Sequence, residues 1–240
     1  MAYLRNTAIV LAGGQGTRMN SQENKQYMLL QEKPVLYYCL ETFQNSFIDE
    51  IILVVAKGQV EYCKKQFIEK CQFTKIIQIV EGGKERYHSV YQGLLKVREC
   101  DYVYIHDGAR PFIEQEHLNK LKEEVLLHQA CVLGMPVKDT IKIADSQLFG
   151  CDTPNRNDVW MIQTPQVFSF SLVYESYKIL MQEEGNLKKN GIFITDDAMV
   201  VECFRQQKIK FVVGSYGNIK LTTPEDMRIA EALLLEKLEK

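Results

Sequence analysis

The chain has 240 residues, of which 46% are hydrophobic and 25% charged, and its formal net charge at pH 7 is -2. This length suits one α/β domain with a sizeable core, and we expect residues 1–240 to form a single domain. The 29 basic and 31 acidic residues nearly balance, so the chain has no overall field to attract DNA, RNA or an acidic membrane. We therefore expect neither nucleic acid nor membrane as a partner, and any anionic ligand must be held by local clusters of cations.

The seven cysteines are odd in number and scattered, and they contain no C-x-x-C pair. This pattern favours reduced thiols that pack as small apolar side chains over a disulfide framework or a zinc site. The first residues, M-A-Y-L-R-N, show no signal-peptide pattern, and no apolar run approaches the ~18 residues of a membrane span. We expect a cytoplasmic protein.

Near the N-terminus, an apolar run at 8–12 leads into a loop that is rich in glycine and also carries two cations. The loop reads A-G-G-Q-G-T-R-M-N-S-Q-E-N-K-Q-Y, with cations at Arg18 and Lys25. A strand that ends in a glycine turn lets backbone N–H groups approach a phosphate, and the cations add positive charge. The loop lacks the G-K-[ST] of a Walker A motif and the third glycine of the dinucleotide-binding fingerprint. Taken alone, it also fits an ordinary tight turn.

Apolar runs and helical stretches alternate through the first half of the chain. The expected strands are 51–56, 75–80, 102–106 and 130–136, and the expected helices are 35–43, 59–70, 85–97 and 115–128. Pro34 opens the first of these helices. The alternation predicts a Rossmann-like α/β fold with a mostly parallel open sheet and right-handed crossovers.

The pattern changes between Val137 and Met161. V-K-D-T-I-K-I alternates between apolar and polar residues, and V-W-M-I-Q closes the segment after a polar loop. Alternation is typical of antiparallel strands with one exposed face, so we expect an antiparallel β-arm here. Beyond it we expect a helix at 171–184, a helix capped by Thr195, a strand at 210–214 and a last helix opened by Thr223 and Pro224.

Candidate functional side chains gather where strands end. The candidates are Arg18, Lys25, Arg86, Ser89, Asp107, Arg110, Lys138, Asp139, Arg156, Thr164, Asp196 and Lys220. Ligands of open parallel sheets bind beyond the carboxyl ends of the strands, where three glycine-bearing loops are expected to meet. The excess of cations around glycine loops suggests chemistry at phosphate, in which positioning and charge stabilisation supply the rate. No Ser-His-Asp spacing, acid/base carboxylate pair or H-x-x-x-H motif supports nucleophilic or zinc chemistry.

A series of motifs in this chain resembles the 2-C-methyl-D-erythritol 4-phosphate cytidylyltransferase family. The motifs are A-G-G-Q-G-T-R-M, N-K-Q-Y, G-G-K-E-R-Y-H-S-V, H-D-G-A-R-P-F, V-K-D-T-I-K, T-P-Q-V-F, T-D-D-A and N-I-K-L-T-T-P-E-D. They occur in the family's order between about residues 7 and 235. The resemblance implies transfer of CMP from CTP to methylerythritol phosphate, with release of diphosphate, in non-mevalonate isoprenoid biosynthesis. It also implies a magnesium-dependent homodimer in which the arm at 137–161 reaches toward the partner subunit.

The same resemblance implies roles for individual residues. Arg18 and Lys25 would stabilise charge on the α-phosphate, and Arg156 and Lys220 would hold the polyol phosphate for attack. Asp107 would lie near magnesium, which is held mainly by the CTP phosphates. The residues expected to bind CTP are Ala12, Gly13, Gly14, Gly16, Gly82, Gly83, Arg86, Ser89, Asp107 and Gly108, with Gly82, Gly83 and Ser89 at the cytosine. Thr164 is expected at the polyol substrate, and Arg110 and Thr140 are expected near that substrate or the dimer seam.

Two other functions stay open. The A-G-G of the first loop also occurs in the similar ribitol 5-phosphate cytidylyltransferases, whereas R-Y-H-S-V and G-A-R-P favour methylerythritol phosphate. A nonenzymatic nucleotide-binding protein on the same fold is the second alternative, although such a protein has little reason to keep all four catalytic cations. For Arg86 and Lys138, a structural ion pair stands beside ligand contact as an equal interpretation.

Overall fold

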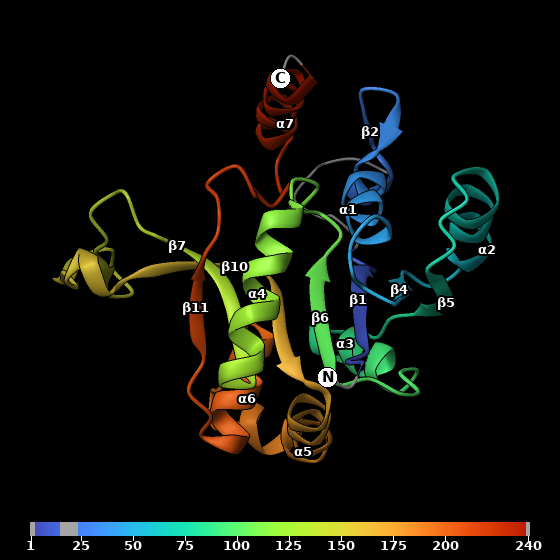
Figure 1. Ribbon diagram of the computed structural model, residues 1–240. Coiled ribbons are helices and arrows are strands. Elements are labelled where there is room, and N and C mark those ends of the chain that lie inside the picture. Colours follow the sequence, from blue (N-terminus) through green and yellow to red (C-terminus); the bar gives the residue numbers. More distant parts are fainter. Residues whose placement is uncertain (1–2, 15–23, 239–240) are drawn as a thin grey trace.

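The computed structural model describes residues 3–14 and 24–238. Within them, a seven-stranded sheet with the order β11-β7-β10-β6-β1-β4-β5 forms the centre of the molecule (Figure 1). Its strands are β1 (Asn6–Ala12), β4 (Glu50–Val55), β5 (Ile76–Glu81), β6 (Tyr102–Asp107), β7 (Ala130–Pro136), β10 (Trp160–Ser169) and β11 (Lys210–Val213).

All neighbouring strands of this sheet are parallel except where β10 is involved. β1 pairs with β4 and β6, β4 with β5, and β7 with β11, each in parallel, whereas β10 runs antiparallel between β6 and β7. In Figure 1 the arrow of β6 therefore points up and that of β10 points down. The predicted Rossmann-like, mostly parallel open sheet is confirmed. The sequence had suggested no element for T-P-Q-V-F, which lies within β10.

Helices cover both faces of the sheet because side chains of successive strand residues point to opposite faces. In β1, Val10 packs with the helices of one face and Ile9 with those of the other. One face carries α1 (Val35–Gln44), α2 (Val60–Cys63) with the π-helical η3 (Lys64–Lys70), and α4 (Gln115–His128), and the other carries α3 (Arg86–Leu94), α5 (Phe170–Lys189) and α6 (Asp197–Arg205).

The carboxyl edge of the parallel strands, at the top of Figure 1, carries the remaining elements. Helix α7 (Pro224–Leu238) packs there against the hairpin of β2 (Leu29–Leu30) and β3 (Lys33–Pro34). A short 3₁₀ turn, η2 (Lys25–Tyr27), precedes the hairpin. Helix α7 and the hairpin therefore cover part of this edge, next to the loops in which the parallel strands end.

The structure moves several predicted boundaries. The helix expected at 59–70 divides into α2 and η3, α3 ends at Leu94, and α5 extends to Lys189. The predicted cap of α6 by Thr195 is wrong. The N-cap is Asp196, whose carboxylate accepts a hydrogen bond from the Met199 N–H at 3.0 Å. A carboxylate at this position satisfies a free N–H group and also interacts favourably with the helix dipole.

The arm between β7 and β10 projects from the sheet at the left of Figure 1. Within it, β8 (Ile143–Ala144) and β9 (Gly150–Asp152) pair antiparallel, and η4 (Arg156–Asp158) forms one 3₁₀ turn. The antiparallel arm is confirmed, but V-K-D-T-I-K-I forms a strand only at its last residue. The last predicted arm residues, Trp160 and Met161, belong to the central sheet, where they pair with β7.

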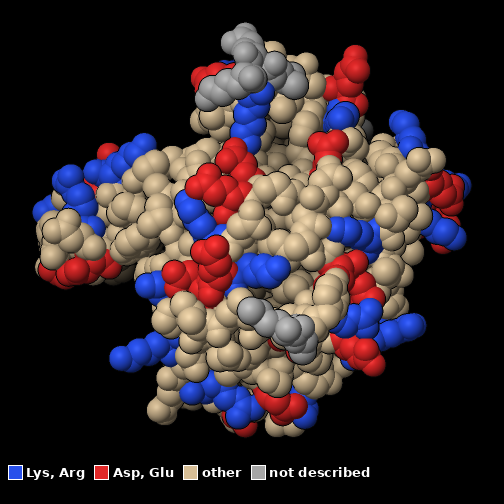
Figure 2. Space-filling view, viewed as in Figure 1, with Lys and Arg blue, Asp and Glu red and all other residues tan. Residues whose placement is uncertain are grey.

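Surface charge, helix length and the state of the cysteines bear on the partners and the environment expected from the sequence. Figure 2 shows acidic and basic side chains interspersed over the visible face. Among the described residues, no helix combines the length and apolarity needed to cross a membrane. All seven cysteines are free thiols.

Candidate active site

A cavity of about 520 Å³ lies at the carboxyl edge of the parallel strands. The loops that follow β1, β5 and β6 line it together with the segment before α7. The lining residues are Leu11, Gly13, Gly14, Lys25, Gln26, Gly83, Lys84, Glu85, Arg86, Ser89, Asp107, Ala109 and Lys220. The volume falls in the range of small-molecule sites. The structure thus brings together eight sequence-predicted residues: Gly13, Gly14, Lys25, Gly83, Arg86, Ser89, Asp107 and Lys220.

The other predicted residues do not line this cavity. Ala12 ends β1, and Gly82 and Gly108 directly follow β5 and β6, so each of the three is adjacent in sequence to residues of the lining. Thr140 and Arg156 lie on the arm, where Arg156 Nη2 donates to Thr140 Oγ1 at 3.1 Å. Of the other residues expected to contact a substrate, Gly16 and Arg18 lie outside the described residues, and Arg110 and Thr164 have side chains that are bonded within the protein.

The turn after β5 is fixed against the first turn of α3. The Gly83 N–H donates to Ser89 Oγ at 3.1 Å, and Glu85 and His88 form a capping box at the start of the helix. A Cβ on Gly82 would collide with the Ser89 hydroxyl, and a Cβ on Gly83 would collide with His88. Both positions therefore require glycine. The close packing presents the N-terminus of α3 to the cavity, where the free N–H groups and the helix dipole favour an anion.

Asp107, the last residue of β6, joins two of the predicted cations. Its Oδ1 accepts from Arg86 Nε at 3.1 Å, and its Oδ2 accepts from Lys220 Nζ at 2.6 Å. Burial alone would raise the pKa of Asp107, but the two cations outweigh burial and hold that pKa well below its usual range. Asp107 is therefore an ionised bridge between Arg86 and Lys220, and Arg86 does form the ion pair that the sequence left open.

The guanidinium of Arg86 also binds a second carboxylate, that of Asp197 at the start of α6. Nη1 and Nη2 donate to the two oxygens of Asp197 at 2.9 and 2.8 Å, and the Tyr177 hydroxyl donates to the same carboxylate. Sequence analysis named Asp196 of the T-D-D-A motif as a candidate functional residue and missed its neighbour Asp197. A usable signal was its spacing with Val200 and Val201, since all three residues are fully buried on one face of α6.

A buried chain of hydrogen bonds fixes the backbone of Asp107. The Asp107 N–H donates to Thr164 Oγ1 at 3.0 Å, Thr164 Oγ1 and His106 Nδ1 are 3.1 Å apart, and His106 Nε2 lies 3.0 Å from the Arg110 carbonyl oxygen. Only an N–H on Nε2 suits that carbonyl, so Nδ1 accepts the Thr164 proton. Burial lowers the pKa of His106 to about 4, which keeps the ring neutral. His106 therefore orients the loop after β6 by hydrogen bonding, and Thr164 uses its hydroxyl in the same task.

Comparison with known proteins identifies the relatives of this chain. The sequence model of the 2-C-methyl-D-erythritol 4-phosphate cytidylyltransferase family matches residues 6–236. The chain belongs to this family. It is 52% identical over 230 residues to the enzyme of that name from Lachnospira eligens, covering 95% of this chain and 99% of that protein. It is 49% identical over 230 residues to the one from Lachnoclostridium phytofermentans, covering 96% of each.

Solved structures agree with this family membership. The 4-diphosphocytidyl-2C-methyl-D-erythritol synthase from Anaerococcus prevotii is 35% identical with a TM-score of 0.82, covering 97% of this chain and 96% of that one. The 2-C-methyl-D-erythritol 4-phosphate cytidylyltransferase from Thermus thermophilus, at 22% identity and a TM-score of 0.71, shares the fold. The family resemblance inferred from the motifs is therefore confirmed.

The described lining of the cavity offers two carboxylates to the magnesium that the sequence resemblance predicts. Its carboxylates are Glu85 and Asp107, and both oxygens of Asp107 already accept from cations. The described residues contain no cluster of three or more His, Cys, Asp or Glu side chains suited to a metal ion. Magnesium commonly takes few protein carboxylates and several phosphate or water oxygens. The lining therefore fits magnesium that arrives with a triphosphate, with Asp107 as its carboxylate neighbour.

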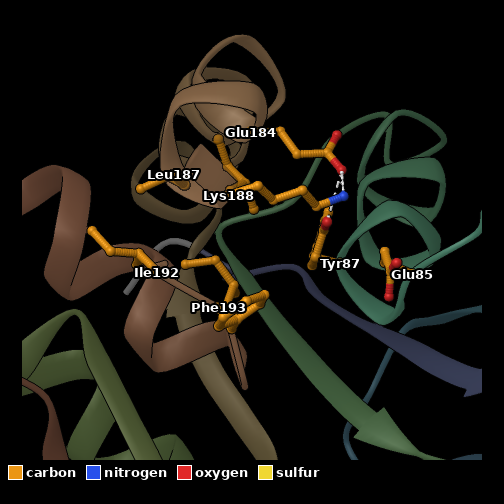
Figure 3. Close-up of a pocket in the computed structure, with 9 residues that line it drawn as sticks. Glu85, Tyr87, Glu184, Leu187, Lys188, Ile192 and Phe193 are labelled. Carbon is orange, nitrogen blue, oxygen red and sulfur yellow. Dashed lines mark hydrogen bonds and ion pairs between the residues drawn. The ribbon is translucent and has the colours of Figure 1, made fainter. Parts of the chain in front are cut away.

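A second cavity, of about 290 Å³, lies between the start of α3, the second half of α5 and residues 192–194 (Figure 3). Glu184 of α5 accepts there from the Tyr87 hydroxyl at 2.8 Å and from Lys188 Nζ at 2.6 Å, and it contacts His88 Nε2 at 3.0 Å. These interactions lower the pKa of Glu184 to about 2. The described lining here has one cation, Lys188, and largely apolar walls, whereas the first cavity is lined by Lys25, Lys84, Arg86 and Lys220, so phosphate chemistry fits the first cavity better. The Glu184 cluster attaches the start of α3 to α5.

Proposed function

We propose that this chain transfers CMP from CTP to 2-C-methyl-D-erythritol 4-phosphate, giving 4-diphosphocytidyl-2-C-methyl-D-erythritol and diphosphate. The observation that carries the proposal is the cavity itself, where two glycine turns and the N-terminus of α3 meet Lys25, Arg86 and Lys220. Backbone N–H groups and cations around one space suit a triphosphate. Membership of the family supplies the substrate class.

The proposed reaction is displacement at the α-phosphorus of CTP. An oxygen of the polyol phosphate forms the new bond to phosphorus, the bond to the bridging oxygen of the β-phosphate breaks, and diphosphate leaves with the electron pair. Lys25, together with Arg18, stabilises the charge that grows on the phosphate oxygens. Lys25 is only 9% exposed, which makes its charge more effective than that of a solvated lysine. Bound magnesium supplies further charge neutralisation on the triphosphate.

The remaining proposed contacts divide between the two substrates. The turn at Gly82 and Gly83, with Ser89, receives the cytosine, because Gly83 and Ser89 line the cavity beside the start of α3. Lys220 holds the polyol phosphate while its bond to Asp107 fixes its position. Arg156 and Thr140 complete the polyol site from the arm, and Arg110, which donates to the Asn218 carbonyl oxygen, supports the segment that carries Lys220.

We propose that the arm acts across a homodimer. Its apolar side chains are largely exposed, with Ile143 at 51%, Phe149 at 68% and Leu148 at 87%. An exposed two-stranded hairpin is marginal alone and gains stability by packing on another surface. A second copy would bury these side chains and bring Arg156 to the partner's cavity. Free thiols at all seven cysteines suit the reducing cytoplasm, where we place the enzyme.

Diphosphate release tests the proposed function. Purified protein is incubated with Mg-CTP and either methylerythritol phosphate or ribitol 5-phosphate, with the Lys25→Ala variant as a control for contaminating activity. We expect release with methylerythritol phosphate and little with ribitol 5-phosphate. Preference for ribitol 5-phosphate would assign the chain to that activity, and CTP binding without release from either substrate would indicate a nonenzymatic nucleotide-binding protein.

A further inference from the structure

We propose that Asp197 is a positioning residue of the transfer reaction, and that it acts through Arg86. It holds the guanidinium with only Nε facing Asp107, so that the second oxygen of Asp107 remains available to Lys220. The kinetic part of this inference rests on the proposed function, whereas its geometric part rests on the structure alone.

The hydrogen bonds define one orientation of Arg86. Two Nη groups form a fork with Asp197, and Nε alone reaches Asp107. A planar guanidinium with a bidentate partner on one edge has little freedom to rotate. The side chain of Asp197 is fully buried, whereas that of Arg86 is 28% exposed, so the fork is fixed from the interior. The orientation of Arg86 at the cavity is therefore set by a residue that does not line the cavity.

Asp197 is itself held in place by its surroundings. Its carboxylate accepts from the fully buried hydroxyl of Tyr177 on α5, and its neighbour Asp196 caps α6 through Met199. Burial raises the pKa of Tyr177, so its hydroxyl stays protonated and acts as a donor. The position of Arg86 thus depends on α5 and α6, which are distant in sequence from the cavity loops.

The charges show what Asp197 contributes. Two carboxylates, Asp107 and Asp197, face two cations, Arg86 and Lys220, in one connected network. If Asp197 lost its charge, Asp107 would be the remaining carboxylate in contact with Arg86. The fork would then favour both oxygens of Asp107, where Lys220 Nζ now lies at 2.6 Å. Lys220 would be displaced from the position in which we propose that it receives the polyol phosphate.

The first test is Asp197→Asn, which keeps the side-chain size and removes the charge. We expect the KM for methylerythritol phosphate to rise about tenfold, with a smaller change in kcat, because a charged hydrogen bond has been lost at a distance from the reacting atoms. The matched control is Glu175→Gln on α5, which removes an acid paired with Lys178 and Arg205 at partly exposed positions. We expect wild-type kinetics for this control. Unchanged KM in a folded Asp197→Asn protein would overturn the proposal.

A double-mutant cycle separates positioning from general stability. If Asp197 acts through Arg86, adding Asp197→Asn to Arg86→Gln should change kcat/KM by less than about threefold. Equal losses in the wild-type and Arg86→Gln backgrounds would overturn the proposal. Tyr177→Phe keeps the charge of Asp197 and removes one donor, so we expect the same KM to rise about two- to threefold. This variant decides the question if Asp197→Asn does not fold, since an unchanged KM would contradict the proposal.

A crystal structure of Asp197→Asn tests the geometry without the reaction. We expect Arg86 to turn toward both oxygens of Asp107 and Lys220 Nζ to leave Asp107. Retention of both present contacts would overturn the inference even if the enzyme is active. Failure of the wild-type protein to release diphosphate would instead overturn the proposed function, and the structure of the variant would still decide the role of Asp197.

Discussion

The cavity and the arm differ in how their proposed functional side chains are held. At the cavity, Asp107 is 10% exposed at its side chain, and each of its oxygens has a cationic partner. On the arm, Arg156 and Thr140 are exposed and bond to each other. The first set is fixed by the core of its own subunit, whereas the second has little support from the central sheet.

This difference suggests a division of work. Preorganised charges stabilise a transition state because they need no reorganisation during reaction, which suits the cavity in which we propose that the α-phosphate reacts. Exposed side chains become precise only when another surface orders them, which suits a contribution across a dimer interface.

The buried support of the cavity should make stability depend on pH. The pKa of His106 falls from 6.5 to about 4 on folding, so the unfolded chain binds more protons between these values. This contribution to stability is complete above about pH 6.5 and is lost as the pH falls toward 4, by up to about 3 kcal/mol. The measurement is denaturant unfolding of the wild type and His106→Gln across this range. Parallel stability curves for the two proteins would contradict the assignment.

Lys25→Ala should weaken catalysis more than binding. We expect kcat to fall about a hundredfold, as for loss of an oxyanion-hole donor, because the charge that Lys25 stabilises grows in the transition state. Steady-state kinetics and CTP binding by calorimetry measure the two effects. The control is Lys64→Ala, at an exposed lysine of η3. A rise in the KM for CTP with unchanged kcat would show that Lys25 serves binding alone.

Arg156→Ala should affect the polyol substrate. We expect its KM to rise about tenfold, with little change in the KM for CTP, because an exposed arginine contributes mainly a contact to the phosphate. Lys142→Ala, elsewhere on the arm, is the control. If the KM for CTP rises and that for the polyol phosphate does not, Arg156 belongs to the nucleotide site instead.

The sequence predicted the parallel sheet and the functional residues at its carboxyl edge, because continuous apolar runs and glycine loops report local conformation directly. It did not predict that β10 enters the sheet antiparallel, since a strand buried on both faces has no alternation to reveal its direction. It also missed the task of Asp197, because the partner Arg86 lies 111 positions away in the sequence. Thr164 was assigned to the substrate for the same reason: its hydrogen bonds to His106 and Asp107 exist only in the folded chain.

A mixed dimer tests the central claim, that the cavity of one subunit is completed by the arm of the other. One subunit carries Lys25→Ala and its partner carries Arg156→Ala, and each homodimeric variant serves as the reference. In a shared site the two substitutions fall together in one cavity and leave the other intact, so the mixed dimer should show about half of the wild-type activity, measured as kcat/KM for the polyol phosphate. A mixed dimer no more active than the mean of the two homodimeric variants would show that each cavity uses the arm of its own chain.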